Sequence, residues 1–387
     1  MKKICVITSS RADFGLLKLT LKEIERSSKL DLQLVVTGSH LDSTFGNTVS
    51  EVEAAGFPIA KRLNIIAVGD TSLSVANTMA TAISLMAETF TSLGSDLVLI
   101  LGDRYEIFSA AIAALSLRLP IGHIHGGELT EGAMDDAIRH AITKMAHLHF
   151  VATSEYRDRV IQMGEEASRV HIVGALGVES IHKVETIPKE QLEKDIGFKF
   201  RQKNLLITFH PPTLEPGQAS GQLKELLSAL ETLERYGFIF TYPNFDPEHD
   251  QLIELIKVFV AANPLNSIAV ESLGQVNYFS CIKYVDAVVG NSSSGLLEVP
   301  IFKKPTINIG NRQRGRLCAP SVINCKPIKN EILISLAKTE SSEYLSALSC
   351  QDSPYESHFQ SSKEIARILE ETPFNNLLDK KFHDLGK

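Results

Sequence analysis

Short hydrophobic segments alternate with longer amphipathic ones along almost the whole chain. The hydrophobic segments include KICVITSS (3–10), DLVLILGD (96–103), NLLITFHPP (204–212) and DAVVGNSSS (286–294). Their apolar residues are consecutive rather than alternating, which is typical of strands covered on both faces in parallel sheets. FGLLKLTLKEIERS (14–27) and GQLKELLSALETLERYG (221–237) have helical periodicity, and we expect the second helix to end at a left-handed Gly237. The pattern predicts an α/β protein with parallel sheets.

The alternation is interrupted once, in the charged segment VESIHKVETIPKEQLEKDIGFKFRQKN (178–204). This segment has no strong strand pattern and is followed by a new hydrophobic strand, so we expect a domain boundary there. Each half then contains its own series of strand–loop–helix units. At 387 residues, of which 44% are hydrophobic, the chain is long enough for two such domains.

Charge and cysteine content narrow the class of protein. The net charge of −7 disfavours nucleic acid or an anionic membrane surface as the main partner, so an anionic substrate would be held by local arginines. The apolar run Ile4–Ile7 is too short for a signal peptide, and no segment approaches the ~18 apolar residues of a membrane span. The five cysteines are scattered without C-x-x-C spacing, which predicts reduced thiols, no zinc site and a cytoplasmic location.

Polar residues follow directly after the hydrophobic segments in both halves. In the first half they are Arg11, Asp13, His40, Asp103, Arg104, His123 and His125, and in the second half His210, Asn244, Ser292, Ser293, Ser294 and Arg312. Ligands of open parallel sheets bind beyond the carboxyl ends of the strands. Any one of these residues could instead be a turn or capping residue. Their recurrence predicts two sheets that face each other across a ligand cleft.

Two motifs of the second half suit a diphosphate. VVGNSSSGLLEVP (288–300) predicts a strand, a turn of small residues and a short helix, whose hydroxyls and N–H groups can bind phosphate. Glu298 in this motif could accept hydrogen bonds from ribose hydroxyls. GNRQRGR (310–316) places three arginines within five residues of an acidic protein. An ordinary serine cap and a solvated basic loop are the alternative interpretations.

The segment HIHGGELTEGAMDDAIRH (123–140) concentrates three histidines and four carboxylates around a glycine pair. We expect one of His123 and His125 to face the site and the other to be a core histidine. These histidines could bind a metal with Glu128 and Asp135, but the remaining spacing matches no closed ligand set, so we predict no metal. Asp135 begins a helix, where an acid is favourable, and its i, i+4 spacing to Arg139 predicts an ion pair on the helix surface.

The familiar cofactor and hydrolase motifs are absent from the sequence. TSSRADFG (8–15) stands where G-x-G-x-x-G would follow the first strand, and there is no P-loop, G-x-S-x-G or H-E-x-x-H. In GDRYE (102–106), Asp103 and Arg104 could supply an acid and a cation to the site. Alternatively, Asp103 could cap the next helix. The pattern indicates acid–base chemistry on a phosphorylated ligand without a cofactor.

Taken in order, SSRADFGLL, GDRYE, HIHGGELTEGAMDDAIRH, TFHPPT, GNSSSGLLEVP and INIGNRQRGR resemble the UDP-N-acetylglucosamine 2-epimerase family, and more narrowly its hydrolysing branch in sialic and related nonulosonic acid pathways. The resemblance extends from about residue 4 to about residue 370. It implies two Rossmann-like domains in the glycosyltransferase-B arrangement, covering 1–180 and 181–354. SPYESHFQSSKEIARIL (353–369) is similar to the helix that closes such chains, so we expect 355–387 to return to the first domain.

The resemblance also implies a reaction without metal or redox cofactor. A base removes the C2 proton while the nucleoside diphosphate leaves C1, and water adds to the resulting 2-acetamidoglucal to release N-acetylmannosamine and UDP. Asp103, Asp135 and His210 match the family's catalytic positions. The resemblance implies that the diphosphate is held by Arg11, His210, Ser292, Ser293 and Arg312, with Glu298 on the ribose.

One position departs from the family pattern, because many relatives have a glutamate where this chain has His125. We expect Glu128 to be essential and His125 to lie in the site with an open role. An alternative substrate is a nucleotide-linked N,N'-diacetylbacillosamine, as in legionaminic acid pathways. A glycosyltransferase-B-type transferase and a non-catalytic sugar-nucleotide sensor are the alternatives from other classes. By resemblance, we also expect a homo-oligomer, a dimer or tetramer.

Overall fold

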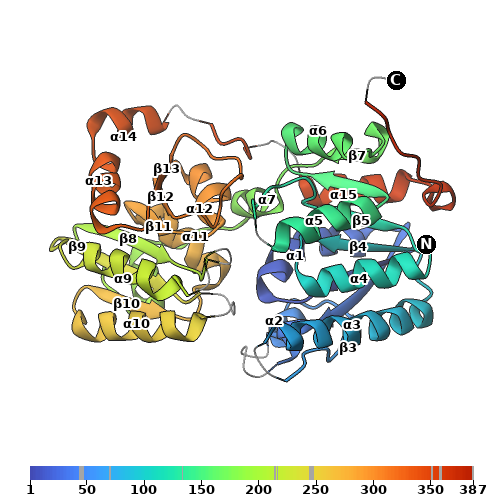
Figure 1. The fold of residues 1–387 in the computed structure, drawn as a ribbon, viewed down its shortest axis with the longest axis horizontal. Coiled ribbons are helices and arrows are strands. Elements are labelled where there is room, and N and C mark those ends of the chain that lie inside the picture. Colours follow the sequence, from blue (N-terminus) through green and yellow to red (C-terminus); the bar gives the residue numbers. More distant parts are fainter. Residues whose placement is uncertain are drawn as a thin grey trace. The chain divides into compact units, whose positions relative to one another are not determined.

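The structure is a computed structural model that describes residues 1–42, 48–68, 71–132, 134–212, 215, 217–243, 248–349, 352–356 and 360–385. The chain divides into two compact units. The first comprises Met1–Glu128, Met134–Ser180 and Ser357–Lys387, and the second comprises Leu129–Ala133 and Ile181–Glu356. Each unit is built around its own sheet (Figure 1).

The first unit contains a parallel sheet with the order β3-β2-β1-β4-β5-β6-β7 in its described residues. The strands are β1 (Lys2–Thr8), β2 (Leu30–Thr37), β3 (Ile59–Leu63), β4 (Leu97–Leu101), β5 (Ile121–Ile124), β6 (Leu148–Val151) and β7 (Val170–Ile172). Strand β1 pairs with β2 on one side and β4 on the other, so that Ile4 lies opposite both Leu32 and Leu97. The chain order therefore reverses beside β1, which is where open α/β sheets bind ligands.

Helices cover both faces of this sheet (Figure 1). They are α1 (Arg11–Arg26), α2 (Val49–Ala54), α3 (Ser72–Leu93), α4 (Tyr105–Ser116), α5 (Met134–Met145), α6 (Ser154–Gln162), α7 (Leu176–Lys183) and α15 (Ser361–Glu371), with the 3₁₀ helices η1 (Gly38–Leu41), η3 (Ala167–Arg169) and η5 (Phe374–Asn376). Alternate residues of β1 point to opposite faces. Ile4 and Val6 join a core with α1 and α15, whereas Cys5 and Ile7 join a second core with α3 and α4.

Helix α15 packs on the first unit although it follows the second unit in sequence. Its Ile365 and Leu369 are buried in the same core as Ile4. At the C-terminus of this helix, the Nζ of Lys2 donates to the carbonyl oxygens of Leu369 at 3.0 Å and Thr372 at 2.7 Å. Both ends of the chain are thus held on the first unit by apolar packing and by bonds that satisfy the helix C-terminus.

The second unit contains a parallel sheet with the order β10-β9-β8-β11-β12-β13 in its described residues. The strands are β8 (Lys203–Thr208), β9 (Tyr236–Thr241), β10 (Ser267–Val270), β11 (Ala287–Gly290), β12 (Thr306–Ile309) and β13 (Val322–Cys325). The helices are α8 (Lys189–Ile196), α9 (Ala219–Leu230), α10 (His249–Ala262), α11 (Gly274–Tyr284), α12 (Ser294–Leu297), α13 (Lys329–Thr339) and α14 (Ser342–Ser349), with the 3₁₀ helix η4 (Val299–Phe302). Separate cores on the two faces pack against α9, α10 and α13, and against α8 and α11.

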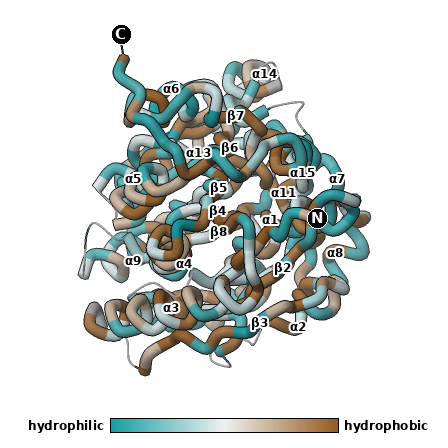
Figure 2. The backbone as a smooth tube through the Cα atoms, turned by 90° about the vertical axis from the view of Figure 1, so that its right-hand side faces the viewer, coloured by the Kyte–Doolittle hydropathy of each residue, from teal (hydrophilic) through white to brown (hydrophobic). Residues whose placement is uncertain are grey.

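The prediction of two parallel α/β sheets is confirmed, and hydrophobic residues recur along the strands and helices of both (Figure 2). The predicted end of the helix at 221–237 is wrong. Helix α9 ends at Leu230, and Gly237 lies inside β9. A Cβ at Gly237 would lie 2.7 Å from the Oδ1 of Asn204, so glycine is needed there for close packing and not for a helix end. Among the described residues, no helix is long and apolar enough to cross a membrane.

Candidate active site

In the first unit, the turn after β1 is held together by the carboxylate of Asp13. This carboxylate accepts hydrogen bonds from the hydroxyl of Thr8 at 2.6 Å and from the backbone N–H groups of Ser9 at 2.9 Å and Ser10 at 3.0 Å. Ser10 in turn caps α1 in a reciprocal capping box with Asp13. Arg11 points outward and forms an ion pair with Glu51 at 3.3 Å. Arg11 therefore lies partly exposed at this edge of the sheet, whereas the Asp13 carboxylate holds the turn together.

His40 also supports this turn. It is completely buried, and its Nε2 lies 3.0 Å from the hydroxyl of Thr8 while its Nδ1 lies 2.8 Å from that of Thr48. Burial lowers the pKa of His40, although Asp13 opposes the shift. Gly38, at φ +60°, makes this approach possible, because a Cβ there would lie 2.7 Å from the carbonyl oxygen of Ser9. In this structure His40 orders the edge of the sheet through Thr8 and Thr48, and its predicted role in substrate binding stays a prediction.

Asp103 and Arg104 follow β4 and point to different partners. The Arg104 guanidinium bonds the buried carboxylate of Glu106 at 2.9 and 3.2 Å, and this carboxylate raises the pKa of Arg104. Asp103 bonds the Nη2 of Arg139 on α5. Helix α4 has Arg104 at its N-cap and no side-chain capping bond, so Asp103 does not act as the cap. Asp103 instead connects the end of β4 to α5.

His125 and Glu128 form a pair in the turn after β5. His125 has φ +66°, a left-handed conformation that is strained for a residue other than glycine. Its Nε2 accepts from the N–H of Leu176 at 3.4 Å, and its Nδ1 lies 3.1 Å from the Oε1 of Glu128. The Glu128 side chain is only 3% exposed. The Nδ1 of His125 thus lies beside a buried carboxylate.

Arg139 joins these groups, a role that the sequence pattern missed. Its side chain is 1% exposed, and it donates to Asp103, to the backbone carbonyl of Glu128 at 2.9 Å and to Asp136 at 3.4 Å. Burial alone would lower the pKa of Arg139, but Asp103 and Glu128 raise it. The predicted ion pair between Asp135 and Arg139 on the helix surface is wrong in its location, because Arg139 points into the unit. Asp135 lies in the first turn of α5 and is partly exposed.

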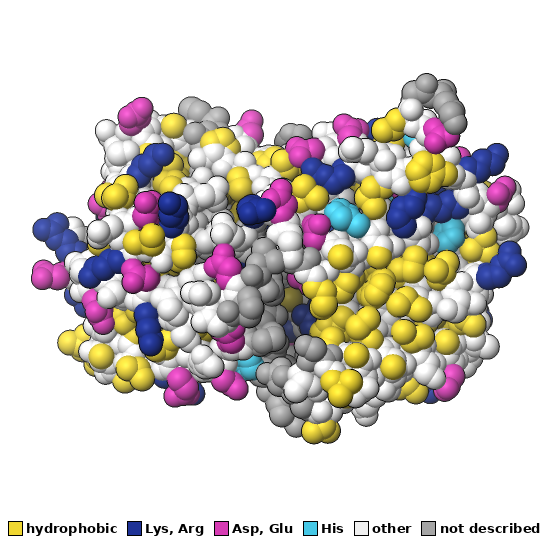
Figure 3. Space-filling model, viewed as in Figure 1, with side chains coloured by type: hydrophobic (Ala, Val, Ile, Leu, Met, Phe, Trp, Pro, Cys, Tyr) yellow, Lys and Arg dark blue, Asp and Glu magenta, His cyan; other side chains and the backbone are white. Residues whose placement is uncertain are grey.

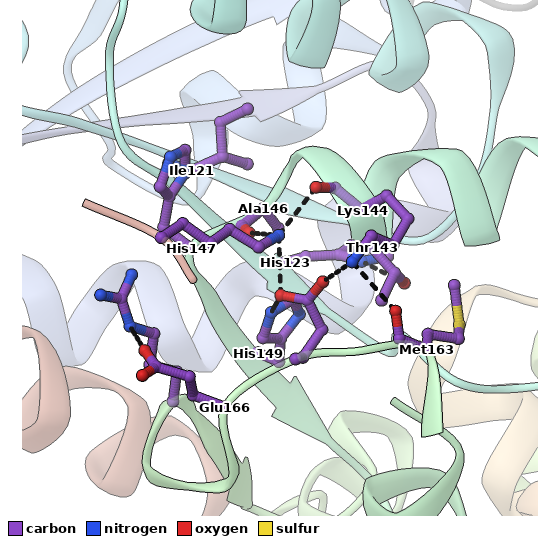
Figure 4. Close-up of polar contacts among 12 residues, drawn as sticks. Ile121, His123, Thr143, Lys144, Ala146, His147, His149, Met163 and Glu166 are labelled. Atoms are coloured by element: carbon purple, nitrogen blue, oxygen red, sulfur yellow. Dashed lines mark hydrogen bonds and ion pairs between the residues drawn. The ribbon is translucent and has the colours of Figure 1, made fainter. Parts of the chain in front are cut away.

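His123, two residues before His125, is the core histidine of the pair. It is completely buried, and its Nε2 lies 2.9 Å from the carbonyl oxygen of Gly102. Burial lowers its pKa to about 3, so it is neutral at physiological pH. Figure 4 shows His123 beside Thr143 and His149 in a polar cluster of the first unit.

In the second unit, His210 lies at the end of β8 and is bound to Asn291 at the end of β11. The N–H of His210 donates to the Oδ1 of Asn291 at 2.7 Å, and the Nδ2 of Asn291 donates back to the His210 carbonyl at 2.8 Å. This convergence requires Gly290, where a Cβ would lie 1.9 Å from the carbonyl oxygen of Thr208. Burial and nearby Arg312 lower the pKa of His210 well below its usual value, so its ring is neutral at pH 7.

Arg312 and Gln313 extend this cluster from the loop after β12. Both donate to the carbonyl oxygen of Asn291, at 3.3 Å and 2.9 Å. Arg314, the next arginine of the predicted basic loop, is paired with Glu131 at 2.6 Å. Arg312 is therefore the arginine of this loop that lies beside His210. Asn291 was missed as the centre of the cluster, although its position directly after a strand was visible in the sequence.

The serine run connects to Glu298 through side-chain hydrogen bonds. Tyr278 on α11 donates to the hydroxyl of Ser294 at 2.7 Å, and Ser294 donates to Glu298. Burial raises the pKa of Glu298. Ser292 and Ser293 precede α12, which is a single turn. Binding of an anion at this position would depend on the serine side chains, because a helix of one turn has only a small dipole. Asn244, another predicted site residue, lies outside the described residues.

Each unit thus presents polar groups at the carboxyl ends of its strands: an acid–base cluster in the first unit, and a histidine, an arginine and serines in the second. In the described parts of the chain, no three His, Cys, Asp or Glu residues are arranged to hold a metal ion. The prediction that no metal site exists remains a prediction, because part of the chain is not described.

The sequence of the chain is similar to those of several known proteins. The family profile described as UDP-N-acetylglucosamine 2-epimerase matches residues 22–370. A Campylobacter jejuni protein named GDP/UDP-N,N'-diacetylbacillosamine 2-epimerase (hydrolyzing) is 38% identical over 384 residues, which is 99% of each chain. Polysialic acid biosynthesis protein P7 of Escherichia coli is 37% identical over 356 residues, covering 92% of this chain and 90% of that protein.

Among solved structures, the UDP-GlcNAc 2-epimerase of Neisseria meningitidis bound to UDP-GlcNAc is similar to this chain, with a TM-score of 0.81. The similarity covers 96% of this chain and 100% of that chain at 18% sequence identity, which establishes a shared glycosyltransferase-B-like fold. The profile and the two long relatives establish the family. The chain belongs to the UDP-N-acetylglucosamine 2-epimerase family.

Proposed function

We propose that the chain is a hydrolysing 2-epimerase that converts UDP-N-acetylglucosamine and water to N-acetylmannosamine and UDP. The observation that carries the proposal is the buried Glu128 carboxylate, whose Oε1 lies 3.1 Å from the Nδ1 of His125 at the carboxyl end of β5. A carboxylate can act as a general base on a proton of a substrate that is held within its reach. The matching family profile, described as UDP-N-acetylglucosamine 2-epimerase, supports the substrate.

The proposed first step is an anti elimination. Glu128 takes the proton from C2, the C1–O bond breaks, and its electron pair leaves with the diphosphate to give 2-acetamidoglucal and UDP. His125 is proposed to act as a positioning residue, because its Nδ1 lies 3.1 Å from the Glu128 carboxylate. Asp103, bound to the Arg139 guanidinium, is proposed to accept a hydrogen bond from the sugar.

The proposed second step adds water across the double bond. The hydroxyl group goes to C1 and a proton goes to C2 from the face opposite to the one it left, which inverts C2 and gives the free sugar. Asp135, partly exposed at the start of α5, is the proposed acid for this face. Two acid–base groups are needed because one side chain cannot reach both faces of the ring.

The leaving diphosphate is proposed to be stabilised by Arg312, with hydroxyl donors from Ser292 and Ser293. His210 is neutral because burial and Arg312 lower its pKa, so it can donate one N–H without adding charge. Arg11 of the first unit is a further candidate, and Glu298 is the proposed acceptor for the ribose hydroxyls. Stabilising the charge that develops on the leaving group lowers the barrier to C1–O cleavage.

A second candidate substrate is a nucleotide-linked N,N'-diacetylbacillosamine. The C. jejuni relative that is 38% identical over 99% of both chains carries this substrate in its name. The chemistry at C1 and C2 would be the same, and only the contacts to C4 and C6 of the sugar would differ. Either pathway would operate in the cytoplasm, which fits a sequence whose cysteines are scattered without C-x-x-C spacing.

Proton NMR in deuterated water tests the proposal with purified protein and UDP-N-acetylglucosamine. The expected products are UDP and N-acetylmannosamine carrying deuterium at C2. UDP-N-acetylmannosamine as the product would mean a non-hydrolysing enzyme, and an untouched substrate would refute this choice of nucleotide sugar. The bacillosamine derivative is then added to the same sample, and its turnover would support the second candidate.

Glu128→Gln and Glu131→Gln provide a matched pair for the same assay. Glu131 lies three residues further along, is 46% exposed and pairs with Arg314, so its variant should keep nearly full activity. Glu128→Gln should lose both deuterium incorporation at C2 and UDP release, by a factor of at least about 10². Equal activity of the two variants would remove Glu128 from the mechanism.

A further inference from the structure

The turn that carries Glu128 packs directly against helix α6. Gly127 in this turn has φ +80°, and a Cβ there would lie 2.5 Å from the carbonyl oxygen of Tyr156 and 2.9 Å from the Cγ2 of Val160. Tyr156 and Val160 are completely buried. A carbonyl group in a turn has no partner in a strand ladder or a helix, so it needs a donor from another element. Helix α6 is close enough to provide one.

Arg159 of α6 is that donor. Its Nη1 donates to the carbonyl oxygen of Gly127 at 2.5 Å. The next carbonyl along the turn, that of Glu128, accepts from the Nη1 of Arg139 on α5 at 2.9 Å. The peptide groups on both sides of the Glu128 Cα are therefore each bonded to a guanidinium, and the two guanidinium groups come from different helices.

This arrangement fixes the direction in which the Glu128 side chain leaves the backbone. Peptide groups are planar, so holding the two that flank a Cα leaves its φ and ψ little freedom. The turn needs such support, because His125 and Gly127 both have positive φ, and backbone in sparsely populated conformations persists only where the surroundings hold it. Hydrogen bonds from a charged guanidinium are stronger than those between neutral groups.

The remainder of the outer face of α6 is an ordinary charged surface. Arg157 pairs with the exposed Asp158 at 3.8 Å, and the Nη2 of Arg159 bonds the exposed Glu155 at 3.1 Å. Figure 3 shows basic and acidic side chains mixed over this part of the first unit. Exposed pairs of this kind contribute little to stability. The bond of Arg159 to the turn, and not its surface pair, is the unusual feature.

We propose that Arg159 is a positioning residue of the reaction, which acts through the Gly127 carbonyl to hold the Glu128 carboxylate within reach of the substrate's C2 proton. The inference rests on the proposed function, because that function makes Glu128 the base. Arg159 acts through the backbone, so its loss should lower kcat and change KM little. A displacement of about 1 Å at the reacting groups can cost a factor of about 10² in rate.

The kinetic test compares two variants of Arg159 with two control variants. Arg159→Met keeps the apolar stem and removes the guanidinium, and should lower kcat by a factor of about 10 to 10². Arg159→Lys can still donate one hydrogen bond to the Gly127 carbonyl and should recover much of this loss. Arg157→Met and Glu155→Gln change charges on the same helix and should keep the kcat of the unaltered protein.

The second measurement is hydrogen–deuterium exchange without substrate. The N–H of His125 donates to the carbonyl oxygen of Phe150 at 2.9 Å, so its exchange reports how often the start of the turn opens. In Arg159→Met, the peptide that covers residues 125–128 should exchange at least about 10-fold faster than in the unaltered protein, because the turn loses a hydrogen bond to a charged group. In Arg157→Met its exchange should be unchanged.

The two measurements separate this inference from the proposed function. An unaltered protein that turns over neither nucleotide sugar would refute the function, whereas exchange still decides whether Arg159 holds the turn. A purely structural role would lower the Tm of Arg159→Met and leave its kcat, measured well below that Tm, unchanged. If Arg159→Met does not fold, Arg159→Gln gives the same comparison.

Three results would overturn the proposal. One is an Arg159→Met variant with the kcat of the unaltered protein, and another is a variant that loses kcat while exchange in the turn is unchanged. The third is an Arg159→Lys variant no more active than Arg159→Met, because the loss would then not come from the bond to Gly127.

Discussion

Glu165 offers the sharpest test of how the first unit is held together, because it is a fully buried carboxylate with three charged or polar partners. Its oxygens lie 2.6 Å from the Nζ of Lys144, 2.7 Å from the Nζ of Lys380 and 3.0 Å from the Nε2 of His149. Lys380 also donates to the carbonyl oxygens of Lys144 and Ala146 at the end of α5. Glu165 thus connects the C-terminal segment to the helix whose first turn carries Asp135.

The perturbation is Glu165→Gln, which keeps the shape of the side chain and removes its charge. Burial alone would raise the pKa of Glu165, but hydrogen bonds from His149, Lys144 and Lys380 lower it from 4.5 to about 2. A shift of that size corresponds to about 3 kcal/mol of stability. Removing one partner of a buried ion pair costs about 3–5 kcal/mol, and Lys380, whose side chain is only 16% exposed, would lose this carboxylate. Both estimates predict a large loss.

The assay is thermal unfolding of Glu165→Gln beside Glu166→Gln. Glu166 is adjacent in sequence and pairs with Arg169 at 2.8 Å, but its side chain is 32% exposed (Figure 4). Partly exposed pairs contribute about 0–1 kcal/mol. For a domain of this size, the loss at Glu165 should lower Tm by roughly 10 °C and the loss at Glu166 by about 2 °C. Equal Tm values for the two variants would refute the argument that burial decides the contribution.

The pH dependence of this difference has a definite sign. Because the pKa of the folded state is lowered, the ionised Glu165 stabilises the fold above about pH 4.5, and this contribution is lost as the pH falls towards about 2. The Tm difference between the unaltered protein and Glu165→Gln should therefore be full at pH 7 and shrink below about pH 4.5. A difference that grows on acidification would contradict the assigned ionisation.

Three further predictions concern the candidate site. Arg139→Lys should lower kcat by a factor of at least about 10² with little change in KM, because lysine cannot bond Asp103 and the Glu128 carbonyl together. Steady-state kinetics measures both constants, and an unchanged kcat would contradict this role. Gly290→Ala should prevent stable folding of the second unit, at a cost above about 4 kcal/mol, because the added Cβ would lie 1.9 Å from the Thr208 carbonyl oxygen. Solubility and circular dichroism report whether the variant folds. A variant as stable as the unaltered protein would refute the close approach. Arg312→Gln should raise the pKa of His210 because it removes a nearby positive charge, although burial keeps that pKa below the usual value. An NMR titration measures this pKa. A pKa of His210 that is lower in the variant would contradict the electrostatic assignment.

The local pattern of the sequence was sufficient for the architecture and for the positions of many polar groups. Consecutive apolar residues in segments such as Leu97–Leu101 reflect burial on both faces, which is a local property and therefore readable from the chain. The ends of these segments placed Asp103, His125 and His210 at the carboxyl ends of strands for the same reason. The motifs in their order were enough to identify the family, and the choice between its substrates stays a proposal.

The partners of these polar groups were decided only by the tertiary structure. Arg139 was predicted to make a surface pair within its helix, but the path of β4 brings Asp103 to it from 36 positions away. His125 takes a left-handed conformation that strand periodicity does not predict, and this conformation directs its Nδ1 at Glu128. Lys380 reaches Glu165 from the far end of the chain. A sequence pattern records which face of an element is buried, whereas pairing between distant residues depends on how the elements are connected and packed in space.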